Sequence, residues 1–229
     1  EVKVLLSDKK MNQLIILGHS NGGVPILADQ AFETLGIEKF VVVKNLDLPD
    51  IKLKNFSIEV RFIHESEFDF SKVESHQVQF GVHNSPAKEI IFNYFCEKYG
   101  VTKNQYLTII HPTAYNATSS QIGFGAFIEP MTVISSMAQL GFGVTVKRSA
   151  SIGHHSILHD FVCINPGAVI SGFVEVGKGT VIGSGAIISN NVQIGKNTLI
   201  GAGSVVTKDI PDGVIAFGNP CKVIRENPS

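Results

Sequence analysis

The stretch VISGFV-EVGKGT-VIGSGA, residues 169–186, divides into three blocks of six residues that share one pattern. The second residue of each block is aliphatic, the sixth is small or β-branched, and glycine often stands third. A period of six matches neither the 3.6-residue turn of an α-helix nor the alternation of an ordinary strand. It predicts a short strand followed by a turn, repeated so that three blocks close one triangular coil.

The same division runs outward from Ile109 to Ile210 without an insertion, which gives seventeen blocks, or between five and six coils. The second residue is Ile, Leu or Val except at Asn116, and the sixth is Ala, Ser, Thr or Val except at Ile210. We therefore expect a left-handed parallel β-helix with strands about 4.8 Å apart. Its aliphatic residues point to the axis, its small residues fit the corners, and its glycines relieve turns with positive φ.

The segment before the repeats has a different pattern, in which short apolar runs alternate with helical periodicity. A strand, a glycine-rich turn, a helix and a second strand form a βαβ unit, so we predict a small Rossmann-like α/β domain. We expect strands at Leu14–Leu17, Phe40–Val43 and Val78–Val82, and helices from Val24 to about Leu35 and from about Pro86 to Tyr99, the latter with Ile90, Ile91, Tyr94 and Phe95 on one face. The predicted domains are residues 1–105, residues 106–210 and a C-terminal tail of residues 211–229.

Composition excludes several classes of protein. The formal net charge of −1 gives no basic excess for a nucleic-acid binder. Three cysteines, Cys96, Cys163 and Cys221, are too few and too scattered for a disulfide framework or a CxxC metal site. The charged N-terminus predicts neither a signal peptide nor an anchor, and no apolar stretch is long enough to span a membrane. A cytoplasmic protein is expected.

The turn Gly18-His19-Ser20-Asn21-Gly22-Gly23 joins the first strand to the first helix. Backbone N–H groups and the positive helix end at such a turn favour an anion, commonly a phosphate. The spacing is not the GxGxxG fingerprint, and Lys44-Asn45 stand where an acidic ribose ligand is expected, so a dinucleotide is disfavoured. A mononucleotide diphosphate and a purely structural turn both remain open, and Lys44 is either a phosphate ligand or a solvated strand-end residue.

Residues 18 apart lie above one another in the coils, and one such column contains His154, Gly172 and Asn190. His154 has the chemistry of a general base, since imidazole titrates near neutrality. The Gly172 N–H is placed to meet the growing charge of a thioester oxygen, and the missing side chain leaves room for a pantetheine arm. For His155 and His159 a solvated corner position is at least as consistent as a functional one.

Several motifs together resemble the sugar O-acyltransferase family, which includes sialic acid O-acetyltransferases and bacterial nucleotide-aminosugar N-acetyltransferases. The resemblance covers nearly the whole chain. The motifs are residues 17–23, LGHSNGG; residues 80–84, FGVHN; residues 110–114, IHPTA; residues 150–155, ASIGHH; residues 165–168, NPGA; residues 200–206, IGAGSVV; and residues 218–224, GNPCKVI.

The resemblance implies a homotrimer whose active sites lie between neighbouring β-helices, in a pathway of lipopolysaccharide or glycan biosynthesis. It implies acetyl-CoA as co-substrate and a nucleotide sugar bound by the N-terminal domain. The predicted catalytic residues are His154, Gly172 and His155, and the predicted coenzyme-binding residues are Gly172, Asn190, Gly201, Ala202, Gly218, Asn219 and Pro220. The predicted substrate-binding residues are Gly18, His19, Ser20, Asn21, Gly22, Lys44, Asn45, Gly81 and Lys147.

The chain departs from the family pattern at three places. His155 stands where the family has an acid after the base, and Asp160 is the alternative orienting group, although it lies on the next corner. Lys147, followed by Arg148, replaces an asparagine, and two cations there suit an anionic acceptor or only face solvent. Lys44-Asn45 replace a strand-end acid. These departures affect the acceptor more than the donor.

A zinc enzyme is the competing interpretation, because His154 and His159 have the spacing of the γ-class carbonic anhydrases. The position of that family's third histidine holds Thr118, so no metal is expected. The favoured hypothesis is an acetyl-CoA-dependent N-acetyltransferase of a nucleotide-linked amino sugar, acting by direct attack because no cysteine shares the His154 column. The alternatives are an O-acetyltransferase of a sialic-acid-like or other hydroxyl acceptor, and a non-catalytic trimeric scaffold.

Overall fold

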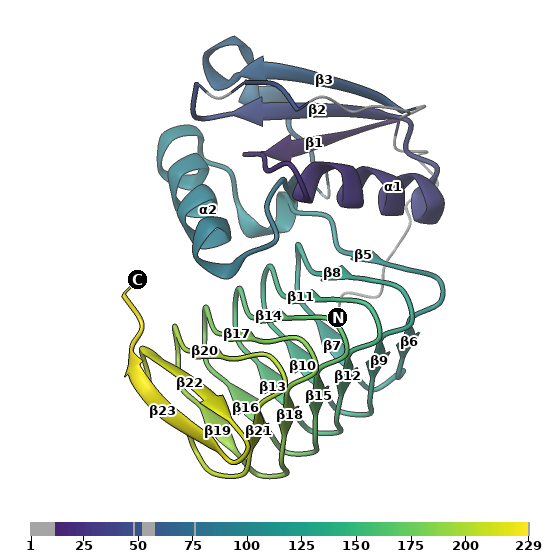
Figure 1. Cartoon of the computed structure of the whole chain (residues 1–229). Coiled ribbons are helices and arrows are strands. Elements are labelled where there is room, and N and C mark those ends of the chain that lie inside the picture. Colours follow the sequence, from purple (N-terminus) through teal and green to yellow (C-terminus); the bar gives the residue numbers. More distant parts are fainter. Residues whose placement is uncertain (1–11, 48, 52–57, 76, 229) are drawn as a thin grey trace.

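The computed structural model describes residues 12–47, 49–51, 58–75 and 77–228. They form an α/β unit followed by a parallel β-helix, which confirms the predicted fold class (Figure 1). Most of the charged N-terminal segment, for which neither a signal peptide nor an anchor is expected, lies outside these residues. Neither α-helix within the described ranges is long and apolar enough to cross a membrane.

The N-terminal unit is a parallel sheet of four strands in the order β3-β2-β1-β4, accompanied by two α-helices. Strand β3 is missed by the sequence pattern because its alternating charged and apolar residues suit a half-exposed edge. The elements are β1 Gln13–Leu17, α1 Gly23–Leu35, β2 Lys39–Lys44, β3 Glu59–His64, η1 Glu65–Glu67, η2 Phe70–Lys72, β4 Val78–Phe80, α2 Ser85–Tyr99 and η3 Lys103–Gln105.

The buried face of α2 differs from the expected one. Ile91 and Phe95 are buried, but Ile90 is 66% exposed, because the face is rotated toward Ser85 and Lys88. Apolar periodicity does not identify this face, because one of its buried residues is a lysine, Lys88. The predicted grouping of Ile90 with Ile91 is therefore wrong.

The repeats form three flat faces of parallel two-residue strands. Face one contains β5 Ile109–Ile110, β8 Phe127–Ile128, β11 Thr145–Val146, β14 Cys163–Ile164, β17 Val181–Ile182 and β20 Leu199–Ile200, extended by β22 Val214–Gly218 and its antiparallel partner β23 Cys221–Glu226. Face two contains β6 Tyr115–Asn116, β9 Val133–Ile134, β12 Ser151–Ile152, β15 Val169–Ile170, β18 Ile187–Ile188 and β21 Val205–Val206. Face three contains β7 Gln121–Ile122, β10 Gln139–Leu140, β13 Ile157–Leu158, β16 Glu175–Val176 and β19 Gln193–Ile194.

The register confirms the 18-residue coil, since Thr145 pairs with Phe127 on one side and with Cys163 on the other. Second-place aliphatic residues and sixth-place small residues share one continuous core, from Ile122 to Ala216. The segment after residue 210, expected as a tail, supplies β22 and β23 and so continues face one of the β-helix.

The glycines of the repeats act differently from the expectation. Positive φ occurs at the fifth place of fourteen consecutive blocks, from Gly125 to Gly203, and includes non-glycine residues such as His155. Third-place glycines instead allow close stacking of coils: a Cβ on Gly183 would lie 2.5 Å from the backbone nitrogen of Ala202. The prediction that third-place glycines relieve positive φ is therefore wrong, and their physical role is close backbone approach.

The N-terminal unit packs on face one of the β-helix (Figure 1). Gln30 donates from Nε2 to the carbonyl of Ile128 at 2.7 Å, and Lys88 donates from Nζ to the carbonyl of Gly143 at 2.8 Å. A cluster of aromatic rings fills the junction beside these bonds, namely Phe80, Phe92, Tyr106, Phe142 and Phe161. Face one is thus covered, whereas face two is not covered by this unit.

Candidate functional site

His154 lies at a corner between faces two and three, directly after strand β12. Its imidazole covers Gly172 of the next coil, where an added Cβ would lie 2.7 Å from both Cε1 and Nε2. Gly153 makes this stacking possible, because a Cβ there would lie 2.4 Å from the backbone of Ser171. The structure therefore brings together His154, Gly172 and Asn190, the column that the repeat predicts.

His155 fixes the orientation of the His154 ring. The two Nδ1 atoms are 3.2 Å apart, so one imidazole donates its Nδ1–H to the other. The His155 ring is held by stacking on Phe173, with centroids 4.8 Å apart and planes 19° apart. When His154 is the donor, its Nε2 carries the free lone pair, and among the described residues no side chain or backbone group bonds this Nε2.

The Gly172 amide already has a hydrogen-bond partner within the chain. Its N–H donates to Asn190 Oδ1 at 2.9 Å, and this contact was not anticipated from the sequence. Asn190 therefore competes with any oxyanion for that donor. Asp160, the predicted alternative for orienting His154, accepts from the N–H of Phe142 at 2.8 Å and pairs with Lys103 at 2.7 Å on another corner.

The glycine turn after β1 is mainly a packing device. A Cβ on Gly23 would lie 2.3 Å from the Gly81 carbonyl oxygen, and one on Gly81 would lie 2.0 Å from that of Gly18. The N–H groups of Gly23 and Val24 donate to the Ser20 carbonyl, so they are already used inside the turn. Gly22 differs, since a Cβ added there would have no other atom within 4 Å.

A pocket of about 420 Å³ joins this turn to the β-helix. The helices α1 and α2 both begin at its wall, and neither has an acidic residue in its first turn or a side-chain cap. Two positive helix ends thus face one cavity. The lining residues are Ser20, Gly22, Gly23, Ile26, Val82, His83, Asn84, Ala87, Glu129, Lys147, Arg148 and Pro166.

The predicted acceptor-side cations line this pocket and do not simply face bulk solvent. Lys147 donates from Nζ to Asn165 Oδ1 at 2.8 Å, and Arg148 Nη1 lies 3.2 Å from Glu129 Oε2. Glu129 is buried, and the sequence pattern did not single it out. Its third-place position, where ten of the other sixteen blocks have Gly or Ser, is the signal that could have found it.

Two further polar residues, His83 in the pocket wall and the buried Lys88 behind it, were not among the predicted site residues. Burial, with the nearby cations Lys88 and Lys147, lowers the pKa of His83 to about 3, so this imidazole stays neutral near pH 7. Burial lowers the pKa of Lys88 to about 8, and its Nζ is held by the Gly143 carbonyl and Thr145 Oγ1. Both are pocket features that only packing reveals.

The remaining predicted nucleotide ligands lie outside this pocket, although Lys44 ends β2 at the same carboxyl edge of the sheet as the glycine turn, where the Gly18 N–H donates to the Val43 carbonyl at 3.0 Å. Lys44 pairs with Asp50 at 2.6 Å, and both charges act on His19, whose pKa is lowered mainly by burial. Among these residues only Ser20 and Gly22 line the pocket with Lys147, whereas His19, Lys44 and Asn45 do not. Lys44 is therefore not the freely solvated strand-end cation of the simpler interpretation.

The predicted coenzyme-binding residues separate into two groups. Gly172 and Asn190 share the His154 corner, whereas Gly201 and Ala202 lie at the corner between faces one and two. Gly218 joins the second group, since its N–H donates to Ser204 Oγ at 3.2 Å, and Asn219 and Pro220 complete the turn between β22 and β23. One chain alone does not bring the two groups together.

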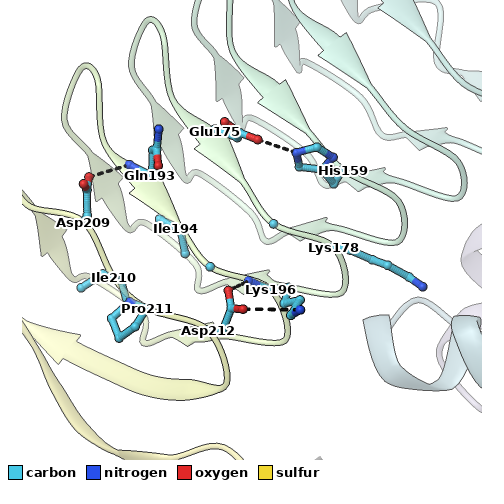
Figure 2. Close-up of a pocket in the computed structure, with 12 residues that line it drawn as sticks. His159, Glu175, Lys178, Gln193, Ile194, Lys196, Asp209, Ile210, Pro211 and Asp212 are labelled. Atoms are coloured by element: carbon cyan, nitrogen blue, oxygen red, sulfur yellow. Dashed lines mark hydrogen bonds and ion pairs between the residues drawn. The ribbon is translucent and has the colours of Figure 1, made fainter.

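Figure 2 shows another hollow, of about 650 Å³, at the corner between faces three and one. Two ion pairs lie within it: His159 Nε2 is 2.7 Å from Glu175 Oε1, and Lys196 pairs with Asp212 at 3.6 Å. Lys178 points away and pairs with Glu89 of α2 at 2.6 Å. No group of three His, Cys, Asp or Glu side chains in the described part of the chain is arranged to hold a metal ion.

Comparisons with known proteins agree with this geometry. The model of the bacterial transferase hexapeptide family, six repeats, matches residues 173–208. The acetyltransferase domain of PglB from Neisseria gonorrhoeae, solved with acetyl coenzyme A, is 25% identical, with a TM-score of 0.76 over 93% of this chain and 100% of that chain. WeeI from Acinetobacter baumannii is 26% identical, with a TM-score of 0.74 over 93% of this chain and 100% of that one.

A variant of perosamine N-acetyltransferase from Caulobacter crescentus, solved with CoA and GDP-perosamine, is 21% identical. Its TM-score is 0.76 over 95% of this chain and 99% of that chain, and the likeness shows the fold alone. None of the curated proteins matches the chain.

The chain is an acyltransferase built on a left-handed β-helix. This class is defined by its hexapeptide coils and by the structural matches, and the position of His154 over Gly172 at a corner of the coils agrees with it. The hexapeptide transferase model over residues 173–208 and the near full-length matches to the PglB acetyltransferase domain and WeeI confirm the resemblance seen in the sequence.

Proposed function

We propose that the protein transfers the acetyl group of acetyl-CoA to the amino group of a nucleotide-linked amino sugar used in glycan assembly. The observation that carries this proposal is the His154 ring, which lies over Gly172 with its Nδ1 bonded to His155 and its Nε2 without a partner among the described residues. The amine nitrogen attacks the thioester carbonyl, His154 Nε2 accepts the amine proton, and the CoA thiolate leaves. The Gly172 N–H meets the oxyanion once Asn190 releases it.

The donor half of the proposal is supported by the PglB acetyltransferase domain, which was solved with acetyl coenzyme A. We infer that its long arm runs between the corner of Gly172 and Asn190 in one copy and the turn of Gly201 and Gly218 in a neighbouring copy. Because this donor is a cytoplasmic metabolite, we also infer a cytoplasmic location.

The acceptor half is supported by the pocket between the domains. Two helix N-termini and Lys147 favour a diphosphate there, and Gly22 leaves room for its close approach. The same two-domain fold holds GDP-perosamine in the perosamine N-acetyltransferase, although that likeness extends to the fold only. The nucleotide base and the sugar stay open in this proposal.

A homotrimer is part of the proposal, because the pocket and His154 lie on different corners of one chain, with β12 between them. A second copy must bring its His154 corner to the pocket. Face two is suited to this contact: its outward side chains Tyr115, Val133, Val169 and Ile187 are 38–62% exposed and apolar. Face three instead presents Gln121, Gln139, Glu175 and Gln193. Such an exposed apolar stripe is typical of an interface between subunits.

The test measures thiol release from acetyl-CoA with a panel of UDP-, dTDP- and GDP-linked amino sugars and with matched hydroxyl acceptors. We expect turnover with an amino sugar and a loss of kcat of about 10²–10⁴-fold in His154→Ala. His159→Ala is the matched control, because this imidazole pairs with Glu175 on another corner. Turnover with hydroxyl acceptors alone would establish O-acylation, and a fully active His154→Ala would remove the assigned base.

A further inference from the structure

Glu129 places a carboxylate with one unused oxygen in the wall of the pocket. It follows strand β8 at the corner between faces one and two, and its side chain is 3% exposed. Its Oε2 accepts from the backbone N–H of Arg148 at 3.1 Å and from Nη1 of the same residue at 3.2 Å. Its Oε1 has no hydrogen-bond partner within the described part of the chain.

The fold gives no reason for this arrangement. A buried polar atom without a partner destabilises the folded chain, and does so more when the group is charged. The repeat does not require an acid at this place, because the equivalent residues one coil away on either side are His111 and Lys147. Arg148 neutralises the charge only from the outside, since its own side chain is 60% exposed. An unpartnered buried group of this kind is characteristic of a site that a ligand completes.

The chemistry of the pocket indicates what completes it. Every other ionic feature of its wall favours an anion: the two helix ends, Lys147 and Arg148, with the neutral His83 beside them. An ionised carboxylate only accepts hydrogen bonds, so Oε1 needs an N–H or O–H donor. Glu129 and Lys147 belong to the β-helix wall, opposite the glycine turn. A ligand with a phosphate at one end and hydroxyl or amino donors at the other supplies an anion for the cationic features of the pocket and a hydrogen-bond donor for Oε1 of Glu129.

We propose that Glu129 is a specificity-determining residue of the acceptor pocket, whose free oxygen accepts a hydrogen bond from a hydroxyl or amino group of the sugar. This proposal rests on the proposed function and goes beyond it, since it assigns recognition of the sugar to one named carboxylate of the β-helix wall. Hydrogen bonds to charged groups contribute about 1.5–3 kcal/mol, which corresponds to about 10–100-fold in affinity.

The test compares Glu129→Gln with the wild-type protein in two ways. The first measures binding of UDP, dTDP, GDP and their hexosamine-linked forms. The second measures KM and kcat for the acceptor that the wild-type protein acetylates. Glutamine keeps an oxygen for Arg148 but presents an amide NH₂ group where Oε1 was. We expect the three nucleoside diphosphates to bind within about twofold of wild type and the sugar-linked form about 10–100-fold more weakly. KM rises by the same factor while kcat changes little.

Two controls separate recognition from stability. The melting temperature of Glu129→Gln should equal or exceed that of wild type, because a buried charge is removed and the Arg148 bonds remain. Glu175→Gln, an exposed carboxylate in the other hollow, should change neither binding nor KM. The Glu129 assignment is overturned if the variant binds the diphosphates and their sugar-linked forms equally weakly, if it binds none of them more weakly, or if its melting temperature falls. None of these outcomes affects the proposed function as long as the wild-type protein acetylates an acceptor. A wild-type protein that binds and acetylates none of these compounds would overturn the proposed function as well.

Discussion

Replacement of Gly172 by alanine is the sharpest test of the His154 corner. The new Cβ would lie 2.7 Å from Nε2 and Cε1 of His154 and 3.2 Å from Cδ2, whereas ordinary contacts begin near 3.4 Å. The imidazole must therefore retreat by about 0.7 Å, away from the position fixed by His155. Since misplacement of a reacting group by about 1 Å costs about 10²-fold, we expect kcat to fall about 10²-fold. Gly172 does not have positive φ, so alanine leaves the backbone unstrained.

The assay is thiol release at saturating acetyl-CoA and acceptor, with the melting temperature measured alongside. The decisive control is the double variant. In a His154→Ala background the clash is gone, so Gly172→Ala should cause no further loss of kcat. The reasoning is refuted if Gly172→Ala keeps kcat within about threefold of wild type, or if its full effect persists without the imidazole.

Three other variants test the surroundings of the site and the coils. Lys88→Met removes a lysine whose pKa is lowered from 10.5 to about 8; below pH 8 its buried charge destabilises the folded chain, and this penalty disappears between pH 8 and 10.5. The free energy of unfolding of wild type relative to Lys88→Met should therefore rise by about 3 kcal/mol across that window in denaturant titrations, and a flat or falling difference would contradict the burial effect. His155→Phe should lower kcat about tenfold because the Nδ1 acceptor is lost, while His155→Glu, which restores an acceptor, should stay near wild type; equal activities would show that His155 does not position the base. Gly183→Ala should lower the free energy of unfolding by about 1–3 kcal/mol because its Cβ meets the next coil at 2.5 Å, whereas Gly22→Ala, with open space around it, should be neutral.

The β-helix could be predicted from the sequence because its stabilising contacts repeat locally. Three blocks of six residues close a coil, so the pairing of Thr145 with Phe127 and Cys163 follows from counting along the chain. The same counting places His154 over Gly172. In the α/β unit, local apolar patterns also predict the strands β1, β2 and β4 and the helices α1 and α2. They do not predict β3, since a half-exposed edge strand has no clear pattern.

The pocket between the α/β unit and the β-helix could not be predicted in this way. It forms where α1 and α2 meet the β-helix, and it joins Ser20 and Gly22 to Glu129 and Lys147, which lie more than a hundred residues further on. The burial of Lys88 and the low pKa of His83 depend on the same junction, because desolvation comes from the packed neighbours and not from the local sequence.

The sequence by itself determined the coil, its register and the histidine at its corner, because each depends on a six-residue period carried by neighbouring residues. Only the tertiary structure decided that third-place glycines serve close stacking, that Asn190 occupies the Gly172 N–H, and that Glu129, a residue of the pocket wall, has one buried oxygen without a partner among the described residues. These features depend on distances between segments far apart in the chain, and side-chain packing fixes those distances.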